Sequence, residues 1–169
     1  MEFEDWEPFY EEILEEFGYS REEDRRAAGF LDRRVGEFDT SRLDALFRDE
    51  TVAVVGDAPS LEADDVREDD VVVAADGAAK RLADAGVGVD VIVTDLDGAP
   101  AHATEASHDG TVVVHAHGDN LDALERYLPE FEASNVVGTT QTDPCPFDAL
   151  YNFGGFTDGD RAAFLADEF

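Results

Sequence analysis

Cysteine, basic side chains and long apolar segments are all scarce in this 169-residue sequence. Its single cysteine, Cys145, excludes an internal disulfide and a zinc site built from several cysteines. Cys145 lies between two prolines, and we expect it to be an ordinary loop residue. No apolar run approaches the roughly 20 residues of a membrane-spanning helix, and the acidic N-terminus is unlike a secretory signal. We therefore expect a cytoplasmic protein without a membrane partner.

Positive charge is the scarcest property of the chain. Twelve lysine and arginine residues stand against 42 aspartate and glutamate residues, which gives a net charge of -30. Such a charge repels itself strongly in dilute buffer, whereas at molar salt the Debye length falls to about 3 Å and the repulsion is screened. We therefore expect a halophilic protein from a salt-accumulating cell, in which most acidic side chains serve solvation. The same charge argues against nucleic acids as partners.

Short valine-rich segments that end in polar or glycine-containing turns recur along the chain. They cover residues 51–55, 71–75, 91–94, 111–115 and 135–137. Continuous apolar runs are typical of strands that are buried on both faces of a parallel sheet. Helical segments are expected between them at 77–85, 99–107 and 119–127. This alternation predicts an α/β fold with a doubly wound, mostly parallel sheet, and such sheets bind ligands beyond the carboxyl ends of their strands.

The first 49 residues follow a different pattern, and we expect them to form a helical cap or dimerisation element on an α/β domain of residues 50–169. Apolar side chains recur at helical spacing in Trp6, Phe9, Tyr10, Ile13, Leu14 and Phe17. Gly18 is expected to end this helix, and Ser20 to cap the next. The aromatic stripe is compatible with a ligand platform, but packing against the core is the favoured interpretation.

The segment Asp90–Gly98 (D-V-I-V-T-D-L-D-G) carries the strongest indication of chemistry. Residues two apart in an extended chain point the same way, so Asp95 and Asp97 are predicted to direct their carboxylates at one point if the extension persists to residue 97. Two such carboxylates suit Mg²⁺ bound together with phosphates, and a solvated acidic turn is the alternative. Asp76 follows the preceding strand and is expected to cap the next helix, to contact a metal through water or to bind a ligand hydroxyl.

Polar or glycine-containing loops follow the other strands at the same edge. The loop Gly56-Asp57-Ala58-Pro59-Ser60 offers N–H groups and a hydroxyl as an anion cradle, but it matches neither common glycine-rich nucleotide motif, and a plain surface turn fits it equally well. Lys80 is either a phosphate ligand or an exposed helix residue. His117 is either a phosphate donor or acid or an ordinary loop residue before a helix, whereas His115 is expected in the core.

The segment Gly154–Arg161 (G-G-F-T-D-G-D-R) is the most specific late motif. Its glycines permit a close approach of the backbone to a ligand, Asp158 and Asp160 offer further metal ligands, and Arg161 has the fork geometry that suits phosphate oxygens. A short amphipathic helix over 162–169 is expected to follow. Because an α/β domain commonly closes with a further strand and helix, we expect this chain to be a shortened form.

Taken together, the motifs resemble those of one family. The segments G-D-A-P-S-L, A-A-D-G-A, V-D-V-I-V-T-D-L-D-G, H-A-H-G-D-N, G-T-T-Q and N-F-G-G-F-T-D-G-D-R-A occur in this order. The set resembles the archaeal 6-hydroxymethyl-7,8-dihydropterin diphosphokinases of the MptE type. The A-D-G and T-D-L-D segments are also similar to a pattern in thiamine diphosphokinases. One departure is Asp57, which stands where the family commonly has a second glycine or a similar small residue.

The resemblance implies a Mg²⁺-dependent transferase that moves a diphosphate from ATP to the hydroxymethyl group of the pterin and releases AMP, in folate or methanopterin biosynthesis. It implies that Asp76, Asp95 and Asp97 hold the magnesium ion and that His117 and Arg161 act with them. Residues expected to bind ATP or pterin are Gly56, Pro59, Ser60, Gly77, Lys80, Gly118, Asn120, Gln141, Gly155, Thr157 and Asp158. The alternatives are a thiamine diphosphokinase-like enzyme, a non-catalytic nucleotide-binding module and a glycosyltransferase-like domain.

Overall fold

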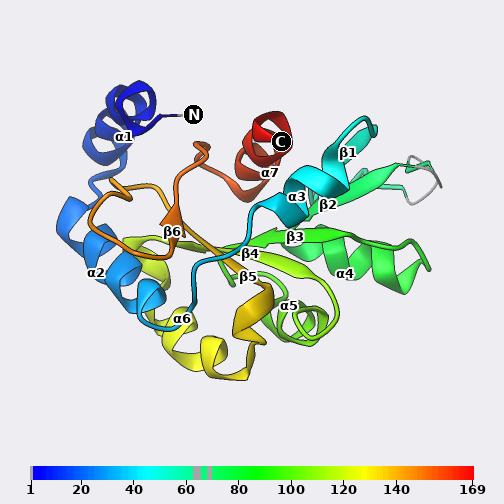
Figure 1. The fold of residues 1–169 in the computed structure, drawn as a ribbon. Coiled ribbons are helices and arrows are strands. Elements are labelled where there is room, and N and C mark those ends of the chain that lie inside the picture. Colours follow the sequence, from blue (N-terminus) through cyan, green and yellow to red (C-terminus); the bar gives the residue numbers. More distant parts are fainter. Residues whose placement is uncertain (1, 63–65, 68–69) are drawn as a thin grey trace.

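The computed structural model describes residues 2–62, 66–67 and 70–169 and shows a parallel β-sheet with helices on both faces (Figure 1). Its 6 strands lie side by side in sequence order, and every neighbouring pair is parallel. They are β1 (Val52–Val55), β2 (Val71–Ala75), β3 (Val91–Thr94), β4 (Thr111–Ala116), β5 (Val136–Thr140) and β6 (Leu150–Tyr151). The predicted α/β fold with a parallel sheet is therefore confirmed.

The helices divide between the two faces of the sheet (Figure 1). They are α1 (Phe3–Phe17), α2 (Arg21–Asp32), α3 (Ser41–Phe47), α4 (Gly77–Asp84), α5 (Pro100–Ala106), α6 (Leu121–Tyr127) and α7 (Asp158–Glu168), with 3₁₀ turns at Gly118–Asn120, Leu128–Glu130 and Ala133–Asn135. Right-handed crossovers between strands in sequential order place their helices on one face, and α4, α5 and α6 share that face with α2. Helices α3 and α7 cover the other face.

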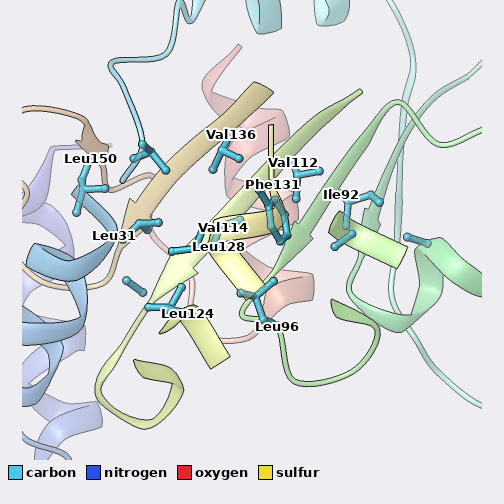
Figure 2. Close-up of a cluster of buried hydrophobic side chains, with 14 of the residues drawn as sticks. Leu31, Ile92, Leu96, Val112, Val114, Leu124, Leu128, Phe131, Val136 and Leu150 are labelled. Carbon is cyan, nitrogen blue, oxygen red and sulfur yellow. The ribbon is translucent and has the colours of Figure 1, made fainter. Parts of the chain in front are cut away.

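Each face of the sheet has its own apolar core. Figure 2 shows the larger one, in which Leu31 of α2 packs in one cluster with side chains such as Ile92 of β3. The second core contains Leu165 of α7 together with Val91 and Val93 of β3. Successive residues of a strand thus enter opposite cores, both of them apolar. This is why continuous valine-rich runs, and not alternating ones, mark the strands of this sheet.

The predicted N-terminal helices all form. Helix α1 ends at Gly18, whose φ of 70° is the left-handed conformation that favours glycine, and Ser20 caps α2 through its side chain. Trp6 and Tyr10 are buried, but Phe17 is half exposed, so only part of the aromatic stripe packs against the core. Helices α2 and α3 contribute to the two cores, and a domain boundary after residue 49 stays a prediction.

Helix α7 positions the candidate site. After β6 the chain returns over the sheet face of α3, and α7 packs against β1, β2 and β3. The N-terminus of α7 reaches the carboxyl end of β3, where Asp158 accepts a hydrogen bond from the backbone of Asp95. A crevice beyond the strand ends results, at the edge that the sequence predicts. Among the described helices, none combines the length and the apolar character needed to cross a membrane.

Candidate functional site

A cavity of about 490 Å³ opens beyond the carboxyl ends of β3 and β4. Its walls come from the loops after these strands, the end of β5, the start of α7 and the turn between α1 and α2. The lining residues are Tyr19, Asp95, Asp97, His117, Asp119, Asn120, Gln141, Phe156, Thr157, Asp158 and Arg161. Except for Tyr19, Asp119 and Phe156, all of these are site residues that the sequence predicts, and the fold brings them to one place.

The chain turns directly after β3, so the predicted extension to residue 97 is wrong. The strand ends at Thr94, and Leu96 has a φ of 73°, a left-handed conformation that is uncommon outside glycine. This turn buries Leu96 in the core and leaves Asp95 in the cavity wall and Asp97 exposed. The N–H of Asp97 donates to Oδ1 of Asp95 at 3.3 Å. The two carboxylates are therefore neighbours because of a turn, and not because of strand alternation.

Asp76 does not cap α4 with its side chain. Its Oδ1 accepts a hydrogen bond of 2.7 Å from the hydroxyl of Thr94 on the neighbouring strand. A side-chain carbon on Gly98 would collide with this carboxylate, so a glycine is needed there. Burial, followed by the negative charges of Asp95 and Asp76, raises the pKa of Asp97. Asp76 does not line the cavity, but it shares one electrostatic environment with the two carboxylates that do.

The carboxylate of Asp95 is held from two sides. Nε2 of His117 lies 3.3 Å from Oδ2, and Nη1 of Arg161 lies 3.7 Å from the same oxygen. Burial raises the pKa of Asp95, but the hydrogen bond with His117 and the positive charges of Arg161 and His117 outweigh burial and hold the pKa below its ordinary value. Asp95 is therefore a fixed negative charge at neutral pH.

The side chain of Asn120 joins the ends of β3 and β4. Its Nδ2 donates to the carbonyl oxygens of Asp95 and His115 at 2.8 and 2.7 Å, and its Oδ1 accepts from the N–H of His117 at 3.0 Å. Both polar atoms of the amide are thus engaged. In this structure Asn120 positions the backbone of Asp95 and His117.

Arg161 and Asp158 form a buried ion pair in the first turn of α7. Nη1 of Arg161 lies 2.7 Å from Oδ1 of Asp158, and Oδ2 of Asp158 accepts from the N–H of Asp95. Burial, opposed by the charge of Arg161 and reinforced by that of Asp95, raises the pKa of Asp158 to about 6. Thr157 caps the helix, and Gly155 is buried in the loop before it, with a φ of 92°. Within the described chain, the buried Nε of Arg161 has no hydrogen-bond partner.

Asp24 of α2 organises the adjoining wall, although the sequence analysis did not single it out. Its carboxylate is 1% exposed and accepts hydrogen bonds from the hydroxyl of Tyr10, from Nε2 of Gln141 and from the N–H of Gly118. One signal was present in the sequence. Asp24 lies on the apolar face of its helix, at helical spacing from Ala27, Ala28 and Leu31. An acid on such a face requires polar partners from elsewhere in the fold.

Several predicted phosphate contacts lie outside the cavity. Gly56, Pro59 and Ser60 are exposed after β1, and Gly77 begins α4. Lys80 is exposed on α4, with its Nζ 2.6 Å from Oδ2 of Asp84, and a contact with phosphate stays a prediction.

Arg81 holds the loop after β1 in place. Its guanidinium donates to Oδ1 of Asp57 at 2.8 Å and to the carbonyl oxygens of Ala58 and Leu61. Asp57, which departs from the pattern of the resembled family, therefore faces a cation of its own chain.

No three His, Cys, Asp or Glu side chains converge as ligands of one ion within the described residues. The donor chemistry nevertheless fits Mg²⁺, which binds through one or two carboxylates and completes its shell with water and phosphate oxygens. Charge supports the same conclusion. The cavity lining holds four aspartates and one arginine, so a polyphosphate would be repelled unless a cation accompanied it.

Known proteins are similar to this chain over nearly its whole length. Residues 33–169 match the family model described as 6-hydroxymethylpterin diphosphokinase MptE-like. The 6-hydroxymethyl-7,8-dihydropterin pyrophosphokinase of Pyrococcus furiosus is 47% identical over an alignment of 175 residues, which covers 99% of this chain and 73% of that protein. Proteins of the same name from Methanothermobacter thermautotrophicus and Methanocaldococcus jannaschii are 44% and 34% identical, over 98% and 100% of this chain and 73% and 76% of their own lengths.

Proposed function

Because this chain belongs to the MptE-like family of 6-hydroxymethylpterin diphosphokinases, we propose that it transfers a diphosphate from ATP to the hydroxymethyl group of 6-hydroxymethyl-7,8-dihydropterin. The names of the relatives specify a pterin acceptor and a diphosphate transfer. The observation that carries the proposal is the cavity at the carboxyl ends of β3 and β4, where Asp95 and Asp97 meet Arg161 and His117. Acidic side chains and a guanidinium in one cavity suit a magnesium–polyphosphate.

The reaction exchanges one phosphorus–oxygen bond for another. The hydroxymethyl oxygen forms a bond to the β-phosphorus of ATP, the bond from that phosphorus to the oxygen shared with the α-phosphorus breaks, and AMP leaves with the electron pair. The hydroxyl proton passes to solvent. Since there is little covalent chemistry for the protein to perform, catalysis consists of positioning the reactants and stabilising the charge on the phosphate oxygens.

Each residue of the site has a proposed role in that task. Asp95 and Asp97 would hold Mg²⁺, Asp76 would contact the ion directly or through water, and the bound ion would neutralise phosphate charge. Arg161 contacts phosphate oxygens, and Asp158 keeps its guanidinium in the cavity wall. His117 donates a hydrogen bond to a phosphate oxygen or to the departing AMP.

The remaining predicted residues support this machinery. Gly118, Asn120 and Gln141 hold the loops in place, whereas Gly56–Ser60, Gly77 and Lys80 stay proposed contacts of ATP from neighbouring strand ends.

We place the reaction in archaeal tetrahydrofolate or tetrahydromethanopterin biosynthesis, in the cytoplasm of a salt-accumulating cell. A homodimer formed through the N-terminal helices is a further prediction.

The test measures AMP formation from ATP and the dihydropterin in molar KCl. Asp95→Asn and Asp97→Asn should each abolish AMP formation without changing the circular dichroism spectrum, whereas Asp122→Asn, an exposed position on α6 outside the cavity, should retain it. Wild-type turnover in either cavity variant would refute the metal assignment.

The acceptor and the class of protein are tested with the wild-type chain. Thiamine offered beside the dihydropterin separates a thiamine diphosphokinase from a pterin enzyme. ATP binding without AMP release for any acceptor would support a non-catalytic nucleotide-binding module. Binding of a nucleoside-diphosphate sugar would support the glycosyltransferase alternative.

A further inference from the structure

One side of the cavity is aromatic. Tyr19, from the turn between α1 and α2, and Phe156, from the loop before α7, both line it. Phe17 packs against both rings. Its ring centroid lies 5.6 Å from that of Tyr19 at an interplanar angle of 13°, and 5.2 Å from that of Phe156 at 34°. Residues from opposite ends of the chain thus build one aromatic surface, and two of its rings, Tyr19 and Phe156, line the cavity.

Core packing does not account for this surface. Phe17 is 51% exposed and Tyr19 is 37% exposed, although exposed apolar area costs free energy in water. Ligand sites are typically concave surfaces in which aromatic side chains provide the contact area and a few polar groups fix the orientation. Offset stacking on such rings is the favourable arrangement for a planar ligand.

Asp119 supplies a polar group in the same cavity. It is exposed, and within the described residues its carboxylate has no hydrogen-bond or ion-pair partner. Asp119 and Tyr19 also line a small adjoining hollow beside the start of α2, so the two residues border two hollows in common. A carboxylate accepts hydrogen bonds on two oxygens and donates none, so it selects for a ligand edge that presents adjacent N–H groups.

We propose that Tyr19, Phe156 and Asp119 form the seat of the pterin ring, a role that rests on the proposed function. The ring stacks on Tyr19 and Phe156, and Asp119 accepts hydrogen bonds from the 2-amino group and from the neighbouring ring N–H. The hydroxymethyl group is attached at the opposite end of the bicyclic ring. In this seat the hydroxymethyl group therefore points away from the carboxylate of Asp119, within the cavity that Asp95, Asp97 and Arg161 also line.

The carboxylate distinguishes a pterin from the adenine of ATP. The pyrimidinone edge of a pterin presents two adjacent donors, which match the two oxygens of a carboxylate. The corresponding edge of adenine presents one donor beside an acceptor nitrogen, whose lone pair would face a negatively charged oxygen. Asp119 therefore favours the acceptor substrate over the nucleotide base at this position.

Binding is measured by the fluorescence of 6-hydroxymethylpterin in molar KCl without nucleotide. Asp119→Asn should weaken binding by about tenfold or more, because it removes a charge-assisted pair. Asp122→Asn, which removes an exposed carboxylate outside the cavity, should leave binding unchanged. Tyr19→Ala and Phe156→Ala should each weaken binding about threefold to tenfold, whereas Phe9→Ala, an exposed aromatic position outside the cavity, should have no effect.

A second ligand separates recognition from a folding defect. In 6-hydroxymethyllumazine a carbonyl oxygen replaces the 2-amino group, so the carboxylate of Asp119 would face an acceptor. Wild-type protein should prefer the pterin to the lumazine, and Asp119→Asn should lose most of this preference. A variant that is merely misfolded would instead lose affinity for both ligands to a similar extent.

The outcomes distinguish the seat from the activity. Unchanged pterin binding in all three variants, with AMP still formed by the wild type, overturns the seat and leaves the proposed function standing. A wild-type protein that neither binds a pterin nor uses the dihydropterin overturns the proposed function, and the seat with it. Variants that raise the KM for ATP and leave the KM for the dihydropterin unchanged would assign the aromatic surface to adenine and overturn the seat.

Discussion

The carboxylate of Asp24 accepts a hydrogen bond of 2.7 Å from the backbone N–H of Gly118, 94 residues further along the chain. This contact fastens α2 to the loop that carries His117. The approach is so close that a side-chain carbon on Gly118 would collide with Glu23. The N-terminal helices are thus joined directly to the wall of the candidate active site, and substitutions in them are expected to change the chemistry.

We predict that Asp24→Asn lowers both stability and turnover. The amide replaces one acceptor oxygen by a donor, so a buried group that now donates to Asp24 loses its acceptor, at a cost of about 1–3 kcal/mol. Urea denaturation in high salt should show this loss in the free energy of unfolding, and kcat for AMP formation should fall. Glu22→Gln, on the exposed side of α2, should stay within about 0.5 kcal/mol of the wild type. An Asp24→Asn variant as stable as the wild type would contradict this account.

Gly98→Ala is predicted to disable the site, because the added carbon would displace the carboxylate of Asp76. A misplacement of about 1 Å near reacting groups can cost about 100-fold in rate, and initial rates of AMP formation should show a loss of that order. Gly88→Ala is the matched control before the same strand, since its added carbon would meet nothing within 4 Å. Equal rates in the two variants would show that the position of Asp76 is unimportant.

Chelation of divalent cations is predicted to abolish turnover and to weaken ATP binding at least about tenfold, because the acidic cavity repels a bare triphosphate. In molar KCl the Debye length is about 3 Å, so only the carboxylates nearest the phosphates contribute to this repulsion. Calorimetric titration of ATP with and without Mg²⁺ measures the effect, and added Mg²⁺ should restore the wild-type affinity. ATP affinity that is the same in both titrations would refute a metal-bridged complex.

His115 is predicted to make folding stability depend on pH. Burial, followed by the positive charges of Arg161 and His117, lowers its pKa well below 6.5 in the folded protein. Below pH 6.5 the unfolded chain therefore binds a proton at this residue that the folded chain does not, and the contribution of His115 to stability falls with falling pH, by up to about 1.4 kcal/mol per pH unit for one proton. When urea denaturation is compared at about pH 7.5 and about pH 5.5, acidification should lower the free energy of unfolding less in His115→Gln than in the wild type. A pH dependence in His115→Gln equal to that of the wild type would contradict this account.

The strands were predictable because a strand that is buried on both faces is a continuous apolar run, which the sequence shows directly. The valine-rich runs located β1 to β5 within a few residues, and β4 and β5 extend further than predicted because Ala116 and Thr140 continue the ladder. The exception is β6, which was not predicted. It consists of Leu150 and Tyr151 alone, and two residues are too few to show a period.

The sequence by itself determined which side chains reach the carboxyl edge of the sheet. In a parallel sheet all strands end at the same edge, so Asp76, Asp95 and His117 were placed there by their positions after apolar runs. Only the tertiary structure decided how they are used. The left-handed turn at Leu96, the hydrogen bond between Asp24 and Gln141 across 117 residues, and the aromatic surface around Phe17 depend on how distant elements pack. Periodicity records the burial of each residue along its own element, but not the identity of the partner that covers it.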